Sequence, residues 1–448
     1  MFRHLANRSA CALLLLLSSG CSEAGDEPTR AERIALLRAA TQAATLTTPP
    51  APPEVNAEEL ALGQALFTSP LLSGNRDTSC ATCHDPLFAS TDGLSLSIGT
   101  GGIGRGPNRQ LTPYRRLHPR NAPELFLRAT PLQTALLRDG GAARNEEGNF
   151  TPPEEAEQPY RDGVSGLVAA VALFHVTQRF DMRGNAGDTA IDGTPNEIAA
   201  IDEDDWHSMW DALATRLRND AAMRPLIAAA FPDADLDTLT LEQLFGALDR
   251  FVAVAFDSRE TPFDRFLEGD DSALSDAALR GALLFTGEAG CTRCHNGPLL
   301  ADGAFHNLGV PFIGLGQEYE EPYDFGRASQ TERTTDRYAF ATAQLRNTAA
   351  TGPWMHNGAY TSLEAAVRHH LDPRDALLRY DWQQLDPLLQ STWHGAPVDN
   401  ARLLSTLDPL LATPVRLSDR DFDDLLTFLR EGLTDNPALD RVAAIEVP

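Results

Sequence analysis

The fold of this chain is decided by two short stretches, Cys80-Ala81-Thr82-Cys83-His84 and Cys291-Thr292-Arg293-Cys294-His295. Each is a Cys-x-x-Cys-His motif, the spacing of a covalent c-type haem attachment. The two thiols can reach the two vinyl groups on one edge of a porphyrin, and the adjacent histidine can reach the iron from the proximal face. In a chain with only 6 cysteines, two such matches predict two covalently bound haem c groups.

Two other uses of the same cysteines stay open at this point. The four thiols could form a zinc site that joins the distant halves of the chain, or each pair could be a redox dithiol. Neither use explains why both motifs end in a histidine. Two haems indicate electron chemistry. A haem iron with two protein ligands can only pass electrons, whereas one with an open face can bind peroxide.

The remaining cysteines, Cys11 and Cys21, lie in an N-terminal segment that is typical of export. Residues 1–21 begin with charge, continue through a short apolar stretch and end Ser18-Ser19-Gly20-Cys21, which predicts a lipoprotein signal with Cys21 lipidated. Ser18 stands where an aliphatic residue is usual, so an ordinary cleaved signal is the alternative. Both interpretations place the protein in the periplasm, with a membrane contact only through a lipid anchor.

Charge and composition exclude several classes of protein. The 448 residues contain 37 Lys and Arg against 63 Asp and Glu, a net charge of −26. No nucleic-acid partner is expected, because phosphates require a basic surface. Opposite fields speed encounter, so a cationic protein partner suits this charge. Hydrophobic residues make up 42%, which is enough for a folded core.

The sequence predicts a mainly α protein built of two cytochrome c-like haem domains with long loops. Residues 22–53, rich in Ala, Thr and Pro, are interpreted as a flexible tether with a short helix near 31–40. Helices are predicted after the capping residues Thr240 and Ser418. Residues 92–123 and 141–163 are rich in Gly and Pro and are predicted to be long functional loops.

A weak internal repeat supports two modules. Gly63-Gln-Ala-Leu66-Phe67 precedes the first cysteine pair, and Gly281-Ala-Leu-Leu284-Phe285 precedes the second. We therefore expect an N-terminal haem domain over 54–240 and a C-terminal haem domain over 241–448. The sequence leaves open whether the final segment packs back on the first module.

Further motifs resemble those of the bacterial di-haem cytochrome c peroxidase family, including its MauG-like branch, which oxidises aromatic side chains of a partner protein. The resemblance covers roughly residues 54–435. Besides the haem motifs, it rests on Ser97-Ile98-Gly99, Arg120-Asn121-Ala122-Pro123, Leu345-Arg346-Asn347, Pro353-Trp354-Met355-His356-Asn357-Gly358 and Leu363-Glu364. It implies a peroxidatic first domain and an electron-transfer second domain, with His84 and His295 as proximal iron ligands.

The resemblance also implies a distal ligand for each haem. On the second haem, the family's Met or Tyr position is occupied by His370, with His369 as the competing register, so this haem is expected to be bis-histidine and of low potential. On the first haem, the family's removable distal His is replaced by Thr100. An open first iron is expected, unless His118 or His175 fills the site.

The family's distal acid is matched by Asp181, which is expected to move the peroxide protons, with His175 as a substitute. Arg138 stands where the family has a Trp between the haems; Trp354 or Tyr360 could take a related role or simply pack in the core. The family's calcium ion is matched by Asn121, with Thr351 and Pro353 offering backbone carbonyls. His356 is expected near the haems without binding iron.

The function expected from this resemblance is reduction of hydrogen peroxide at the first haem. Electrons would pass through the second haem from a protein donor, a small cytochrome c or a cupredoxin. Two alternatives remain: a MauG-like enzyme that oxidises Trp or Tyr of a partner protein, and a non-catalytic di-haem electron-transfer cytochrome with both irons six-coordinate.

Overall fold

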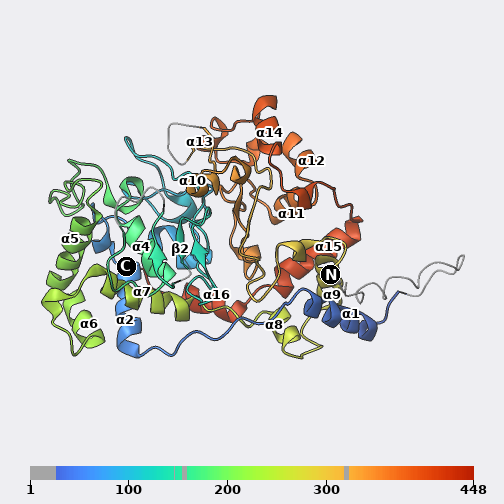
Figure 1. Ribbon diagram of the computed structural model, residues 1–448, viewed down its shortest axis with the longest axis horizontal. Helices are drawn as coiled ribbons and strands as arrows, with labels where there is room; N and C mark the ends of the chain where they lie inside the picture. The colour runs from blue at the N-terminus through green and yellow to red at the C-terminus, as the bar shows by residue number, and fades with distance from the viewer. Residues whose placement is uncertain (1–26, 146, 154–158, 317–321, 448) are drawn as a thin grey trace, which may run out of the picture.

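The computed structural model describes residues 27–145, 147–153, 159–316 and 322–447. It is mainly helical, as predicted, and Figure 1 shows two helical lobes joined by irregular loops. The helices are α1 (Arg30–Ala43), α2 (Ala57–Thr68), α3 (Cys80–Cys83), α4 (Leu167–His175), α5 (Trp206–Asn219), α6 (Met223–Ala230), α7 (Leu241–Ala255), α8 (Pro262–Leu267), α9 (Asp276–Thr286), α10 (Ala328–Thr331), α11 (Leu363–Leu371), α12 (Pro373–Leu378), α13 (Pro387–Gln390), α14 (Pro397–Leu404), α15 (Asp419–Thr427) and α16 (Asn436–Ala443).

The few strands are short and lie near the junction of the lobes. One antiparallel sheet has the order β1 (Ala135–Leu136), β2 (Ala142–Arg144) and β3 (Phe150–Thr151), and a second pairs β4 (Phe305–His306) with β5 (Phe340–Ala341). The Ala341 amide donates a hydrogen bond to the Arg138 carbonyl over 2.8 Å. This bond ties the loop after β1 to β5 of the second lobe.

The first lobe is built on α2, α4, α5 and α7, whose apolar faces form one core. Helix α7 starts at the predicted cap, because the Thr240 side chain and Gln243 form a capping box. Its residues Phe245 and Phe251 lie in the first core, so the first lobe continues past residue 240, where the boundary was expected. The apolar face of α7 is covered by α2 and α4, which explains the difference.

The second lobe is built on α8, α9 and α15, with Phe263, Phe285 and Phe428 at its centre. Helix α15 begins after Ser418, as predicted. Helix α16 then leaves this lobe and buries Ala438 and Val442 in the first core. The question left open by the sequence is thereby answered: the final segment packs back on the first module.

The repeated glycine marks the same helix crossing in both lobes. A Cβ atom on Gly63 would lie 2.3 Å from the Ala247 carbonyl oxygen of α7, and one on Gly281 would lie 2.0 Å from the Asp424 oxygen of α15. Only a residue without a side chain lets these backbones approach so closely. Each cysteine motif therefore follows a helix that is crossed closely by a later helix of its lobe, α7 in the first lobe and α15 in the second.

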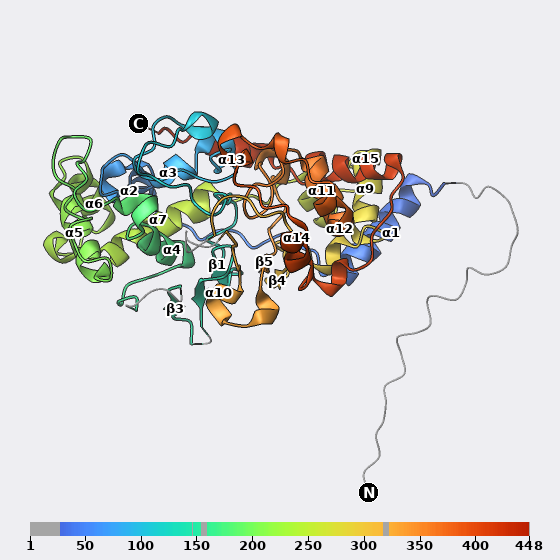
Figure 2. The same ribbon diagram turned by 90° about the horizontal axis from the view of Figure 1, so that it is seen from above.

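The predicted tether differs from the structure in its described part. Helix α1 lies beside α9 in both views (Figures 1 and 2), and its Leu37 is fully buried in the second core. Arg30 and Arg38 form ion pairs with Asp276 and Asp271. One apolar stripe and two matching charges hold this helix on the lobe, although the flanking composition is that of a linker. The predicted signal peptide and Cys21 lie outside the described residues.

The Leu345-Arg346-Asn347 motif has a structural role in the second lobe. The Arg346 guanidinium forms a buried ion pair with Asp264 of α8 at 2.6 Å, and the Asn347 side chain accepts a hydrogen bond from the Asp435 amide. Breaking a buried pair of this kind leaves an uncompensated charge, which is costly.

Within the described residues, none of the helices combines the length and the apolar character needed to cross a membrane.

Candidate functional site: two cavities with a histidine-bearing cysteine motif each

The first motif lies on α3 and forms one wall of a cavity of about 660 Å³. His84 follows the helix, and its Nδ1 lies 3.2 Å from the Ser90 carbonyl oxygen. A carbonyl only accepts, so Nδ1 donates and Nε2 keeps its lone pair for a metal. Burial lowers the pKa of His84 to about 4, which keeps the imidazole neutral.

The other walls of the first cavity are largely apolar. They include Phe67, Phe174, Met182, Phe245 and Leu248. An apolar slot with two thiols and one neutral imidazole on the same wall fits a thioether-linked porphyrin.

The second motif repeats this arrangement in the other lobe. Cys291, Cys294 and His295 line a second, smaller cavity of about 220 Å³. The His295 Nδ1 lies 3.0 Å from the Leu300 carbonyl oxygen, and burial lowers its pKa to about 4. Since the two cysteine pairs line different cavities, the structure brings no four-thiolate zinc site together among the described residues.

A second imidazole faces His295 across this cavity. Helix α11 places the His370 ring centroid 6.4 Å from that of His295. The ring centroids of two imidazoles on opposite faces of one metal ion stand roughly 6 Å apart, because two metal–nitrogen bonds of about 2 Å and the distance from each nitrogen to its ring centre add together. The His370 Nδ1 donates to the Ala366 carbonyl over 2.8 Å, which leaves the Nε2 lone pair available for a metal.

The neighbouring His369 is engaged on both ring nitrogens. Its Nδ1 lies 2.7 Å from the Tyr360 hydroxyl, and its Nε2 lies 2.7 Å from the Leu308 carbonyl oxygen. The ring is fully buried on the side of α11 that packs against Tyr360.

Trp354 lines the second cavity, with its indole N–H donating to the Thr348 carbonyl.

The first cavity carries a different group of side chains beyond His84. Asp181 lies between two imidazoles: His118 Nε2 contacts one carboxylate oxygen, and His175 Nδ1 lies 2.6 Å from the other. All three residues line the cavity. Among the described residues, no imidazole is paired with His84 in the way that His370 is paired with His295.

Local structure explains how Asp181 reaches this position. It lies in a π-helical turn, Arg179–Arg183, directly after α4, which ends at His175. The Thr100 amide donates to the Asp181 carbonyl over 2.8 Å, and a Cβ atom on Gly99 would clash with the same backbone. The Ser97-Ile98-Gly99 stretch and the Thr100 amide therefore hold the backbone of Asp181 in place.

The charges of this cluster follow from its contacts. Burial by itself would raise the pKa of Asp181, but attraction to His118 and hydrogen bonds from His118 and His175 lower the pKa overall. Burial tends to lower the pKa of His118, yet the Asp181 charge raises it above its ordinary value. The Thr100 hydroxyl, the one polar group of its side chain, donates to Asp77 over 2.8 Å.

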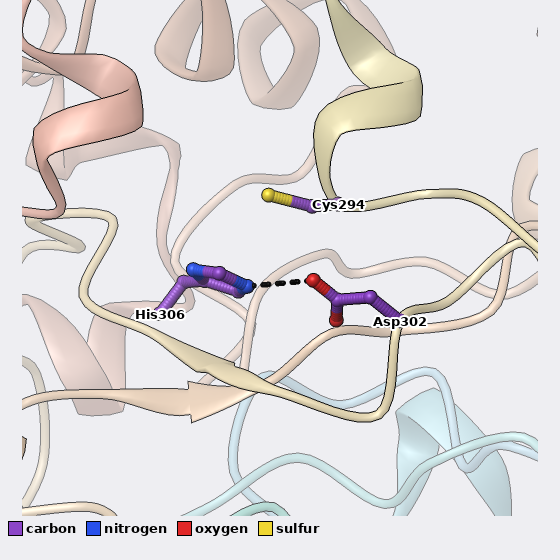
Figure 3. A group of neighbouring side chains, drawn as sticks. All are labelled: Cys294, Asp302 and His306. Carbon is purple, nitrogen blue, oxygen red and sulfur yellow. Dashed lines mark hydrogen bonds and ion pairs between the residues drawn. The ribbon is translucent and has the colours of Figure 1, made fainter. Parts of the chain in front are cut away.

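Figure 3 shows a cluster of Cys294, Asp302 and His306, whose possible ligand atoms all lie within 4.8 Å of one another. Cys294 and His306 line the second cavity, and Asp302 lines the first. His306 bridges two carboxylates, with Asp302 at 3.0 Å from Nε2 and Asp408 at 2.6 Å from Nδ1. Cys294 is one of the two cysteines of the second Cys-x-x-Cys-His motif, and a sulfur held in a haem thioether bond would not be a thiolate ligand. The imidazole is thus best described as part of an ion-paired support for the loop after the motif.

Several polar residues lie between the two cavities. Asn121 and Arg138 line both cavities, and Thr351 and Pro353 line the second. Arg120 is buried between Asp139 and Asp324, at 2.8 and 2.6 Å. His356 stacks on Phe340 with centroids 3.6 Å apart, and burial lowers its pKa to about 3.

Sequence reasoning proposed Asp181, His118 and His175 separately and did not predict their union. Asp181 and His118 are far apart in the sequence, and no motif links them. The position of Arg138 between the cavities also lacks a local signal, because it depends on a contact across the lobes. The contact of His306 with Asp408 joins residues far apart in the sequence.

Comparisons with known proteins agree with this architecture. A family model described as di-haem cytochrome c peroxidase matches residues 57–272. The chain is 30% identical over 316 residues to the methylamine utilization protein MauG of Methylorubrum extorquens, covering 70% of this chain and 69% of that protein. It is 27% identical over 332 residues to the cytochrome-c peroxidase IdrP2 of Denitromonas iodatirespirans, covering 70% and 73%.

Solved structures show a similar fold. A MauG-like protein associated with microbial copper homeostasis superposes with a TM-score of 0.59 at 23% identity, covering 89% of this chain and 96% of that chain. The diheme peroxidase BthA of Burkholderia thailandensis gives a TM-score of 0.54 at 19% identity, with 88% of each chain covered.

Proposed function

The chain belongs to the di-haem cytochrome c peroxidase and MauG family of oxidoreductases, and on that premise we propose that it reduces hydrogen peroxide at the His84 haem, with electrons relayed through the His295 haem. The balanced reaction takes one peroxide, two protons and two electrons to two waters. The electrons come from a protein donor, a small cytochrome c or a cupredoxin.

The unequal surroundings of the two proximal histidines carry this proposal. His295 faces His370 at the spacing of a bis-imidazole site, which suits electron transfer. His84 faces a cavity that contains an acid–base cluster instead. A haem bound there supplies iron that can accept peroxide and electrons.

The proton chemistry is assigned to the Asp181 cluster. Both Asp181 oxygens are engaged by imidazoles, so the carboxylate stays ionised and orients His118 and His175. A neutral imidazole held in this way can take a proton from the near oxygen of peroxide, and a protonated one can give a proton to the leaving oxygen. Asp181 therefore acts through its two histidines rather than by direct transfer.

Spin state and ligand binding test the proposal. In ferric holoenzyme, electron paramagnetic resonance should show one high-spin and one low-spin haem. Cyanide should convert only the high-spin signal, and peroxide should react with the same haem in stopped-flow absorbance. Two low-spin haems that ignore both ligands would establish a purely electron-transferring cytochrome.

Oxidation of a partner protein is the second candidate, because the MauG protein of Methylorubrum extorquens is a 30% identical relative. An imidazole in the His370 position gives the second haem a low potential, which favours sharing oxidising equivalents over accepting electrons from a high-potential donor. Product analysis separates the two: peroxide consumed with stoichiometric donor oxidation supports the peroxidase, and a modified Trp or Tyr in a co-purified partner supports the MauG-like enzyme.

We also propose export to the periplasm with a lipid on Cys21, supported by the charged and apolar residues that precede it. Mass spectrometry of the mature N-terminus should show a diacylglyceryl cysteine. A free N-terminus at another residue would establish the ordinary signal instead.

A further inference from the structure

Arg138 occupies the wall shared by the two cavities. Arg138 lines both cavities, and its backbone carbonyl accepts a hydrogen bond from the Ala341 amide of β5. The side chain therefore starts from a backbone position that both lobes hold. A charge placed here acts on both haem sites at once.

Among the described residues, no carboxylate lies within ion-pair distance of the Arg138 guanidinium; Glu124 acts on its charge from farther away and is itself paired with Arg128. One NH2 group donates to the Asn121 side-chain oxygen over 3.2 Å, and the buried Nε has no hydrogen-bond acceptor. Arg120, by contrast, is paired with two aspartates in the same region. Burial lowers the pKa of Arg138 to about 10, so the group keeps its proton at neutral pH.

A buried, charged donor without an anion is costly unless a ligand supplies the anion. The ligand chemistry that suits a guanidinium is a carboxylate. The porphyrin of a haem c carries two propionate carboxylates, and both haem cavities open onto Arg138.

The calcium site implied by family resemblance does not fit these contacts. The Asn121 oxygen, its one side-chain ligand, is already engaged by the Arg138 guanidinium. A divalent cation there would be repelled by the neighbouring positive charge. Thr351 and Pro353 would add only neutral carbonyls, whereas calcium takes six to eight oxygens, often with carboxylates.

We propose that the Arg138 guanidinium is the fixed cation between the two haems, binding propionate carboxylates in the place where a divalent cation would otherwise be needed. The proposal rests on the two-haem part of the proposed function and not on peroxide reduction. An arginine side chain is not readily oxidised, unlike that of Trp or Tyr. Position 138 therefore holds no residue through which an electron could hop between the haems.

Three variants of the holoenzyme test this assignment. Arg138→Gln removes the charge, Arg138→Lys keeps it without the planar fork, and Arg144→Gln removes an equal charge from an exposed position on neighbouring β2. Covalent haem content and circular dichroism establish that each variant is folded. The first readout is the midpoint potential of each haem, measured by an optical redox titration. The second is the amount of bound calcium, measured by inductively coupled plasma mass spectrometry before and after treatment with EGTA.

In the wild type we expect substoichiometric calcium and potentials that EGTA leaves unchanged. Arg138→Gln should lower both potentials, because loss of a nearby cation stabilises the ferric state, and Arg138→Lys should lower them less. One calcium per wild-type chain whose removal shifts the potentials would overturn the proposal. So would potentials in Arg138→Gln equal to those in Arg144→Gln. Peroxide turnover enters neither criterion, so failure of the peroxidase assignment stays distinguishable.

Discussion

At the scale of the residue, histidines acquire different roles through the partners of their second nitrogen. His84, His295 and His370 each give Nδ1 to a backbone carbonyl, which fixes the tautomer and leaves Nε2 for a metal. In His369, both ring nitrogens form hydrogen bonds with protein groups. Adjacent residues of one helix thus have opposite suitability as ligands.

Exchange of His370 for Met should therefore raise the potential of the second haem. Met as an axial ligand favours the ferrous state relative to imidazole. Spectroelectrochemistry and low-spin electron paramagnetic resonance would measure the change. In His369→Gln, the matched control one residue away, the bis-imidazole spectrum should persist. The reverse pattern would assign the ligand to His369.

The Asp181 cluster predicts a pH effect with a defined sign. Asp181 raises the pKa of His118 above its ordinary value, so His118 holds its proton to higher pH than an isolated imidazole. If protonated His118 assists peroxide cleavage, activity falls as pH rises through this raised pKa. Asp181→Asn should move that limb to lower pH and reduce kcat/KM for peroxide by about 10²- to 10⁴-fold. An unchanged profile would remove His118 and Asp181 from the proton chemistry.

At the scale of the element, close helix crossings set the geometry of each haem module. Gly63 and Gly281 allow α2 and α9 to touch α7 and α15. These crossings position the chain just before each cysteine motif. The repeat seen in the sequence is therefore a repeat of packing.

Gly281→Ala distinguishes a close crossing from a loose one by the sign of its effect. On an open helix surface this change would stabilise the protein by about 1 kcal/mol. Here the new Cβ atom overlaps the Asp424 backbone, so we expect destabilisation by about 1–3 kcal/mol. Guanidinium denaturation of the holoprotein would measure it, and a gain in stability would contradict the crossing.

Helix α1 offers a matched pair of leucines. Leu37 is fully buried against the second core, whereas its neighbour Leu36 is 54% exposed. Leu37→Ala should destabilise the second lobe by about 2–5 kcal/mol, and Leu36→Ala by less than about 0.5 kcal/mol. Equal midpoints in denaturant would mean that α1 is a tether after all.

At the scale of the whole molecule, the ends of the described chain cross between lobes. Helix α1 joins the second core, α16 joins the first, and the loop after β1 is hydrogen-bonded to β5 at residues that line both cavities. The distance and orientation of the two haem sites are thus fixed by both lobes together. The full chain carries a net charge of −26.

Electrostatic steering follows from that charge. The second-order rate of reduction by a basic cytochrome should fall roughly tenfold or more from low to high ionic strength, because salt screens the attraction. An acidic cupredoxin should show the opposite slope. Stopped-flow rates measured across a salt series check both. A basic donor whose rate is independent of salt would show that the encounter surface carries no net negative field.

The sequence by itself determined the two haem motifs, the mainly helical class, the caps of α7 and α15 and the likeness to a family, because these depend on residues close together in the chain. It also gave Asp181, His118 and His175 as separate candidates. Only the tertiary structure decided that these three meet, that α1 packs rather than hangs free, and that Arg138 lies between both cavities. Such outcomes depend on contacts between residues far apart in sequence, for which no local spacing exists.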